Sequence, residues 1–226
     1  MKLVVHDDAG KAYDAAAMRI AELLDHAKVG FTLGLAGGGA AASLYEALQG
    51  RAMAWERVDA WMSDERWVPH DHERSNGRMA VDKLLGRVPA RLHRPPFGES
   101  MDPAESASQY EETLRSIFEG RRPDLVLLGM GEDGHTASLF PGSKAVSEDE
   151  RWFVSNVIPE TGEPRLTSTY PLLWHARRLM MITTGEAKAP ALRDTFDRSN
   201  TPASRIGEGE AEVEWHVDRA AASLLS

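Results

Sequence analysis

The chain has 226 residues, of which 42% are hydrophobic and 27% charged, and it contains no cysteine. This length and composition favour a folded globular protein with a substantial core over a disordered or fibrous one. The lack of cysteine excludes disulfides, a cysteine nucleophile and thiolate-held zinc or iron–sulfur sites, so the chemistry must use other side chains.

The formal net charge of −9 at pH 7 argues against nucleic-acid binding and also repels phosphorylated small molecules. Any anion site must therefore be built locally from a few basic side chains and from helix N-termini. The first residues, Met1–Val5, lack the long apolar core of a secretory signal, and no apolar run approaches the roughly 18 residues of a membrane span. We expect a soluble, cytoplasmic protein that binds neither membranes nor nucleic acid.

Short apolar or β-branched runs alternate with segments whose apolar residues recur at helical spacing. In chain order we predict a strand in the first residues, helix Asp14–Ala27, strand Phe31–Leu35, helix Ala40–Leu48, strand Val58–Met62, helix Pro103–Glu119, strands Leu125–Leu128, Trp152–Ile158 and Leu179–Thr183, and helices Ala187–Phe196 and Asp218–Leu225. Asp102 before Pro103 is a suitable N-cap with proline in the first turn. This alternation predicts an α/β fold with a mainly parallel central sheet and helices on both faces, doubly wound and Rossmann-like.

We expect a single domain over residues 1–226, because the chain has no internal repeat, low-complexity tract or clear linker. The strongest break, Arg94–Gly98, is interpreted as a loop within that domain. In doubly wound sheets, ligands bind beyond the carboxyl ends of the strands, where the strand order reverses. The loops that follow strands are therefore the candidate functional segments, and three of them stand out.

The first loop contains Gly37, Gly38, Gly39 and Ala40 between a strand and a helix. Glycine lets the main chain approach an anion closely, and the helix N-terminus offers unpaired N–H groups, so this loop is a candidate phosphate cradle. A plain strand-to-helix turn is the alternative. The string also matches GxGxxA, with Asp59 or Asp64 at the distance expected for a ribose contact, which keeps an oxidoreductase open.

The second loop places Asp64, Glu65 and Arg66 directly after an apolar strand. At the carboxyl edge of a sheet, Arg66 could pair with phosphate, and a carboxylate could accept hydrogen bonds from sugar hydroxyls; solvated surface charges are the alternative. His70 and His72 follow two residues apart, but no adjacent ligand set accompanies them, so we assign no metal.

The third loop, Gly129–Gly142, is the most specific. Its first glycines match GxGxxG, but Pro141 limits any following helix to about two turns, and no acidic residue ends the next strand, so a dinucleotide site is not expected here. The loop presents Asp133 and His135, and a neutral imidazole is suited to taking a proton from water near pH 7. A structural histidine is the alternative.

This loop resembles the signature of the 6-phosphogluconolactonases, which share a fold with glucosamine-6-phosphate deaminases and ribose-5-phosphate isomerases. Further segments resemble the family in its order: Ser63–Pro69 with Ser75-Asn76, Pro164–Thr167, Thr184–Lys188 and Trp215–Ala222. The resemblance covers essentially the whole chain, and several separated motifs in order are more specific than any single string.

The resemblance implies hydrolysis of 6-phospho-D-glucono-1,5-lactone to 6-phospho-D-gluconate in the oxidative pentose phosphate pathway, without a cofactor. His135 would activate water as general base and Asp133 would orient it. The phosphate would be bound by the Gly37–Ala40 amides with Arg165 and Lys188, and by Arg66 as a further candidate. Asp64 stays a candidate for contacting the sugar.

Two positions decide how far the resemblance extends. Deaminases of this fold carry a glutamate five residues after the histidine and use it for ring opening, whereas this chain has Phe140 there, which argues against deamination. The family usually shows Ser-Gly-Gly-Ser-Thr-Pro in the first loop, whereas this chain has Ala36–Ala41, so side-chain hydroxyls are missing there. Backbone amides and Ser43 are left to bind phosphate.

Two other classes of function stay open. A non-catalytic sugar-phosphate sensor is the first, because effector-binding domains of some transcription regulators resemble this fold; the chain lacks a DNA-reading module, and a sensor has no need of His135. An oxidoreductase is the second, and it rests only on the two glycine strings. We expect a monomer, with a weak homodimer as the alternative.

Overall fold

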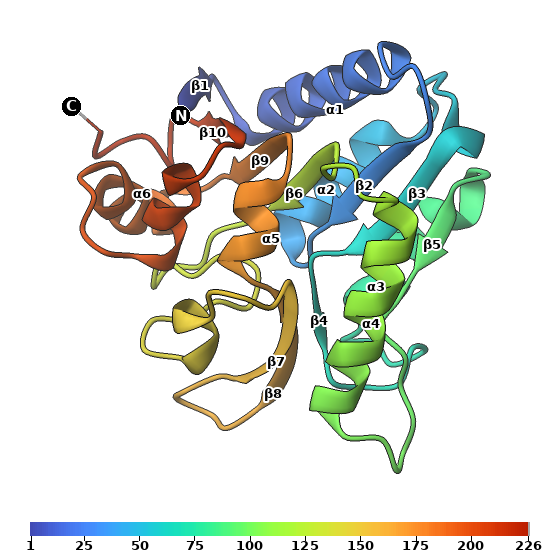
Figure 1. Ribbon diagram of the computed structural model, residues 1–226. Coiled ribbons are helices and arrows are strands. Elements are labelled where there is room, and N and C mark those ends of the chain that lie inside the picture. The colour runs from blue at the N-terminus through green and yellow to red at the C-terminus, as the bar shows by residue number, and fades with distance from the viewer. Residues whose placement is uncertain (226) are drawn as a thin grey trace.

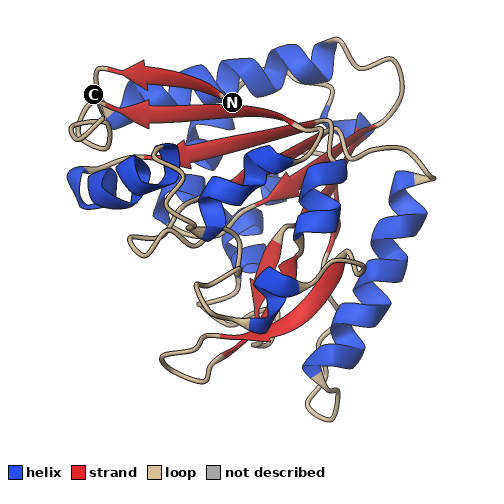
Figure 2. Ribbon diagram, turned by 60° about the vertical axis from the view of Figure 1, so that its left-hand side comes forward, coloured by secondary structure: helices blue, strands red, loops and turns tan. Residues whose placement is uncertain are grey.

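The structure is a computed structural model that describes residues 1–225. Its centre is a seven-stranded sheet in the order β1-β10-β9-β6-β2-β3-β5, in which every neighbouring pair is parallel (Figures 1 and 2). The strands are β1 (Lys2–His6), β2 (Phe31–Leu35), β3 (Val58–Met62), β5 (Arg91–His93), β6 (Leu125–Leu128), β9 (Arg178–Thr183) and β10 (Glu212–Asp218). The predicted mainly parallel α/β sheet is confirmed.

Helices cover both faces of this sheet, as the views in Figures 1 and 2 show together. The α-helices are α1 (Ala9–Asp25), α2 (Gly39–Leu48), α3 (Asn76–Lys83), α4 (Pro103–Phe118), α5 (Tyr170–His175) and α6 (Ala189–Phe196), and short 3-10 helices span Trp55–Arg57, Leu85–Arg87, Lys144–Ser147, Glu186–Lys188 and Pro202–Glu208. Buried side chains of α1, α2 and α3 join one hydrophobic cluster, and those of α4, α5 and α6 join a second.

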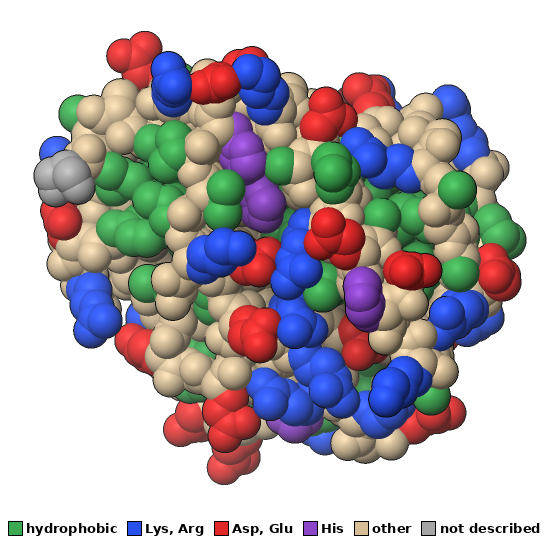
Figure 3. Space-filling model, turned by 90° about the horizontal axis from the view of Figure 1, so that it is seen from above, with side chains coloured by type: hydrophobic (Ala, Val, Ile, Leu, Met, Phe, Trp, Pro, Cys, Tyr) green, Lys and Arg blue, Asp and Glu red, His purple; other side chains and the backbone are tan. Residues whose placement is uncertain are grey.

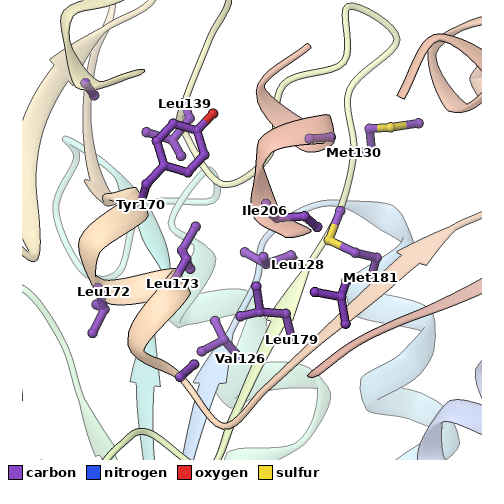
Figure 4. Close-up of a cluster of buried hydrophobic side chains, with 14 of the residues drawn as sticks. Val126, Leu128, Met130, Leu139, Tyr170, Leu172, Leu173, Leu179, Met181 and Ile206 are labelled. Carbon is purple, nitrogen blue, oxygen red and sulfur yellow. The ribbon is translucent and has the colours of Figure 1, made fainter. Parts of the chain in front are cut away.

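The central strand β6 shows how sequence produces this layering. Successive side chains on a strand point to opposite faces, and an all-apolar run therefore suits a strand that is covered on both sides. Val126 and Leu128 lie in the cluster with α4 to α6, whereas Leu125 and Leu127 lie in the cluster with α1 to α3. Figure 4 shows Val126 and Leu128 packed with side chains such as Leu179.

A second, smaller sheet of order β4-β8-β7 is antiparallel. It consists of β4 (Asp64–Arg66), β8 (Pro164–Ser168) and β7 (Phe153–Val157). Only Ser63 separates β3 from β4, so the charged segment Asp64–Arg66 is a strand and not the loop that we expected. Its partner strand lies about a hundred positions later, with Asp64 opposite Thr167, and local sequence patterns do not reveal such a pairing.

The strand order reverses between β2 and β6. From β2 the chain continues through β3 to β5 on one side, whereas from β6 it continues through β9 to β10 on the other. In open parallel sheets this arrangement leaves a crevice beyond the carboxyl ends of the two strands. The loops after β2 and β6 flank that crevice, and they are the first and third loops of the sequence analysis.

Most predicted elements are present with small shifts of their ends, but the predicted helix Asp218–Leu225 is wrong. β10 runs to Asp218, between β1 and β9, and residues 219–224 form turns. The alanines at 220–222 favour helix only weakly, and the chain enters them from a strand whose last residue, Asp218, accepts hydrogen bonds from the Gly185 and Ala221 N–H groups, so turns form there. Strand Trp152–Ile158 exists as β7, although it lies in the antiparallel sheet.

The surface charge and the lengths of the helices also bear on function. Lys and Arg side chains gather near the middle of the face seen in Figure 3, with acidic side chains among them, so the net charge of −9 is unevenly distributed. Within residues 1–225, the structure contains no helix with the length and apolar character to cross a membrane.

Candidate active site

A cavity of about 380 Å³ lies at the reversal of strand order. It is lined by the loops after β2 and β6, by the end of β9 and by β4, through residues Ala36, Gly37, Gly38, Gly39, Ala40, Asp64, Arg66, Gly129, Met130, Gly131, His135, Ala137, Ile182, Thr183, Thr184 and Lys188. Small-molecule sites typically measure about 300–1,000 Å³, so the cavity has the size for one sugar-sized ligand.

One wall of the cavity is the glycine loop after β2. Gly38 is the N-cap of α2, so the unpaired backbone N–H groups of the helix start lie at the cavity. Gly37 packs directly on the amide of Asn76, at the start of α3, so closely that a Cβ at position 37 would lie 2.1 Å from Asn76 Oδ1. The wall therefore presents the unpaired N–H groups of a helix start, and a neighbouring helix backs it.

A second wall carries charge from the strand β4. Asp64 is 7% exposed, and its Oδ2 accepts a 2.7 Å hydrogen bond from Ser138 Oγ. Arg66 donates from Nη1 to the carbonyl of Arg74 at 2.7 Å, which fixes its guanidinium at the cavity. Within the described chain, its Nη2 and Nε have no hydrogen-bond acceptor in the protein and are available to an anion.

The third loop holds the titratable pair of the site. His135 Nδ1 lies 2.6 Å from Asp133 Oδ1, which also accepts the His135 backbone N–H at 3.1 Å. Partial burial acts to raise the pKa of Asp133, but the hydrogen bond and charge of His135 outweigh it and hold that pKa below its usual value. Because the ionised Asp133 accepts the Nδ1 proton, Nε2 of a neutral imidazole keeps its lone pair.

Two neighbours fix the orientation of this imidazole. The ring of Phe140 lies with its centroid 4.6 Å from that of His135, at an interplanar angle of 46°. A Cβ at Gly131 would lie 2.1 Å from His135 Nδ1 and 2.3 Å from Asp133 Oδ1, so only glycine admits the pair at this distance. The loop sequence thus serves the geometry of the histidine–aspartate pair.

Lys188 reaches the cavity from the short 3-10 turn that follows β9 and leads into α6. Its Nζ lies 3.9 Å from Glu132 Oε1, and both side chains are partly or largely exposed. Exposed pairs of this kind contribute little energy, so the ammonium group can exchange this partner for an anionic ligand.

The structure brings most predicted site residues together in this one cavity: Gly37, Gly38, Gly39, Ala40, Asp64, Arg66, His135 and Lys188. Asp133 and Arg165 are not among the lining residues, and neither is Ser43. Asp133 lies behind the imidazole that it binds. Arg165 lies on β8 opposite Arg66, is 9% exposed and donates to Glu163 at 3.1 Å, so it is a neighbour of the wall.

Sequence reasoning missed several residues that complete the walls. Ile182, Thr183 and Thr184 line the cavity because β9 lies beside β6, and strand order cannot be read from local patterns. Asn76 appeared only in a segment that resembles the family, and its contact with Gly37 depends on tertiary packing.

One of the two candidate ribose contacts loses its structural basis, whereas the other, Asp64, lines the cavity. Asp59, near the start of β3, binds Arg91 and His93 and lies outside the cavity lining, so it offers no ribose contact to a dinucleotide there. Among residues 1–225, no group of three or more His, Asp or Glu side chains is arranged to hold a metal ion.

Fold and cavity together define a doubly wound α/β protein with a glycine-rich helix start and a histidine–aspartate pair at its reversal point. Residues 7–215 match the family model described as glucosamine-6-phosphate isomerases/6-phosphogluconolactonase, and the chain belongs to this family. It is 38% identical over 207 residues to the 6-phosphogluconolactonase of Nostoc sp., an alignment that covers 87% of this chain and 85% of that relative.

Solved structures agree with this assignment. The 6-phosphogluconolactonase from Trypanosoma cruzi superimposes with a TM-score of 0.90 and 25% identity, covering 100% of this chain and 97% of the other. A monomeric glucosamine-6-phosphate deaminase superimposes with a TM-score of 0.85 at 22% identity, over 99% of this chain and 100% of the other, which establishes a shared fold.

Proposed function

We propose that this chain hydrolyses 6-phospho-D-glucono-1,5-lactone to 6-phospho-D-gluconate in the oxidative pentose phosphate pathway. The observation that carries the proposal is the position of His135, bound through Nδ1 to Asp133, in the same cavity as the glycine loop and Lys188. Relatives named 6-phosphogluconolactonase, at 38% identity over most of the chain, support the reaction.

The phosphate is bound by the Gly37–Ala40 amides at the start of α2, with Lys188 as the cation that neutralises it. The loop lacks hydroxyl side chains, since it contains only glycine and alanine, so its contribution comes from the backbone. Arg165 does not line the cavity, and it supports the anion site through its positive charge from the strand next to β4. Asp64 lies where its Oδ1 accepts hydrogen bonds from the hydroxyls of the sugar.

In the reaction, Nε2 of neutral His135 takes a proton from a water molecule, and the hydroxide attacks the lactone carbonyl carbon. The tetrahedral oxyanion then needs donors. Gly131 N–H already donates to the His135 carbonyl, and Gly134 N–H to that of Gly131, so both are engaged within the loop. Arg66, with its remaining N–H groups at the cavity, is the donor that this arrangement favours.

Collapse of the tetrahedral intermediate breaks the bond between the carbonyl carbon and the ring oxygen. The imidazolium of His135 returns its proton to that oxygen, which leaves as the hydroxyl of the open-chain acid. Ionised Asp133 stabilises the imidazolium in between. A second carboxylate is not needed, and the place of the deaminase glutamate is filled here by Phe140, which packs on the imidazole.

We further propose that residues 1–226 form one domain that acts as a monomer in the cytoplasm. Both hydrophobic clusters pack on the two faces of the same central sheet, as one domain requires. Size-exclusion chromatography with light scattering tests the monomer, and a mass of twice 24.9 kDa would contradict it.

The proposed function is tested by measuring hydrolysis of 6-phosphogluconolactone and unphosphorylated gluconolactone side by side, with the spontaneous rate subtracted. We expect a strong preference for the phosphorylated lactone, and equal rates would refute the anion site. His135→Ala should lower the turnover number at least about a hundredfold, because general-base action contributes about a hundred- to ten-thousandfold. A variant with full turnover would refute the role of His135.

A further inference from the structure

The carboxylate of Asp218 is buried at the end of β10, outside the cavity lining. It is 6% exposed, and its hydrogen-bond partners in the described chain are backbone N–H groups on two separate segments. Gly185 N–H donates to Oδ1 at 3.0 Å and to Oδ2 at 3.2 Å, and Ala221 N–H donates to Oδ1 at 2.8 Å. Asp218 thus ties the end of β10 to the turn after β9.

That turn carries Lys188, which lines the cavity together with a second basic residue, Arg66. Gly185 precedes the 3-10 turn Glu186–Lys188, and the Lys188 backbone N–H donates back to the Gly185 carbonyl at 3.0 Å. The residue whose N–H group binds Asp218, Gly185, is therefore the start of the turn that carries Lys188. Helix α6 follows directly, from Ala189.

The segment is held on its other side by α1. Thr184 Oγ1 and Tyr13 OH share a 2.7 Å hydrogen bond, so residues on both sides of the Thr184–Gly185 peptide are anchored to different elements. Within residues 1–225, the ion-pair partner of the Lys188 ammonium is the exposed Glu132, at 3.9 Å. Since such an exposed pair orients a flexible side chain weakly, the backbone of the turn decides where Lys188 reaches.

We propose that Asp218 is a positioning residue for phosphate recognition: it fixes the Gly185 turn so that Lys188 reaches the phosphate in the cavity. This inference rests on the proposed function and adds a residue 30 positions beyond Lys188 to it. Asp218 fixes the turn through hydrogen bonds and not through its negative charge, because its carboxylate oxygens accept the backbone N–H groups of Gly185 and Ala221. Asp218→Asn keeps an oxygen at the Oδ1 position, whereas Asp218→Ala removes every acceptor.

The test compares KM and kcat of Asp218→Ala and Asp218→Asn on both lactones. For Asp218→Ala we expect KM for the phosphorylated lactone to rise at least about tenfold, the range expected when a charge-assisted contact is lost, with kcat within about twofold. Turnover of the unphosphorylated lactone should stay within about twofold, and Asp218→Asn should recover most of the affinity. Asp102→Asn, at the N-cap of α4 away from the cavity, is the matched control and should leave all constants unchanged.

A double-mutant cycle with Lys188→Ala separates positioning from general damage. If Asp218 acts through Lys188, then Asp218→Ala should raise KM no further in the Lys188→Ala background. Additive effects, or equal losses on both lactones, would overturn the proposal. If Asp218→Ala does not fold, Asp218→Ser carries the same cycle, because its shorter side chain removes both carboxylate oxygens from the Gly185 and Ala221 N–H groups, and additivity there overturns the proposal equally. Wild-type protein that hydrolyses neither lactone would contradict the proposed function itself, and wild-type hydrolysis with an additive cycle would contradict only the role of Asp218.

Discussion

Replacing Gly37 by alanine should destabilise the protein, because the site has no room for a methyl group. A Cβ at position 37 would lie 2.1, 2.3 and 2.4 Å from Oδ1, Cγ and Nδ2 of Asn76. Asn76 is 1% exposed and cannot swing away cheaply, since its backbone N–H donates to Glu65 at 2.6 Å and its Nδ2 donates to the Asp64 carbonyl at 3.1 Å. The glycine loop or α3 must shift.

Overpacking of this kind costs about 1–3 kcal/mol, and loss of one Asn76 hydrogen bond adds about 1 kcal/mol. At about 2–4 °C per kcal/mol for a chain of this size, the melting temperature should fall by roughly 4–16 °C. Gly39→Ala is the matched control, because a Cβ at Gly39, in the first turn of α2, meets nothing within 4 Å. Alanine is the better helix former by about 0.5–1 kcal/mol, so this control should melt at the same temperature or higher.

The assay is thermal unfolding followed by circular dichroism, together with KM for the phosphorylated lactone. Gly37→Ala should also raise KM, since the loop that cradles the phosphate is the part that moves. If Gly37→Ala had the same melting temperature as Gly39→Ala and the wild-type KM, the close contact between Gly37 and Asn76 would not exist in solution, and the steric reasoning would be refuted.

Three further changes probe single groups. Asp133→Asn should lower kcat at least about tenfold near neutral pH in steady-state assays, because His135 loses the anion that orients it, and an unchanged kcat would contradict this. Glu65→Gln should lower the unfolding free energy by about 1–3 kcal/mol in urea titrations, because the buried Glu65 carboxylate accepts backbone N–H groups at the start of α3; equal stability would count against that role. Burial, and the charge of His6, lower the pKa of His216 from 6.5 to about 4. Between these two pH values His216 is protonated in the unfolded chain but not in the folded protein, so the free energy of unfolding falls as the pH drops from 6.5 towards 4. Wild-type protein should lose about 2 kcal/mol from this group between pH 7.5 and 5, and His216→Gln should lose correspondingly less; identical pH dependence would refute the assignment.

The parts of the fold that could be predicted are those with a strong local signal. Leu125–Leu128 is apolar throughout and forms the buried strand β6, and Asp102 with Pro103 marks the start of α4 correctly. The strand at the end of the chain was missed although it has a local signal. Glu212–Asp218 alternates polar residues with the apolar Val213, Trp215 and Val217, as a strand does, and it pairs with β1 and β9; the helix-forming alanines that follow suggested a helix instead.

The same distinction between local signals and tertiary packing applies to the residues of the site. The glycine loop and His135 could be predicted, because glycine placement and a histidine after a strand are local features with a chemical meaning. The positions of Arg165 and Asn76 could not, since each depends on which distant segment packs against it. Arg165 is opposite Arg66 only because β4 and β8 pair, and Asn76 meets Gly37 only because α3 packs beside α2.

Ser63, the single residue between β3 and β4, gives the site a mechanical property. Its N–H and Oγ both donate to the Leu35 carbonyl at 2.8 Å, and its own carbonyl accepts from Ser168 N–H at 2.8 Å. The end of β2, the Asp64 wall and the small sheet are therefore fastened at one point, and the two walls move as a unit. The entropic cost of ordering the site is incurred on folding, so the cavity is preorganised before the ligand binds. Backbone amides around Ser63 should therefore exchange with deuterium as slowly in the free protein as in the complex.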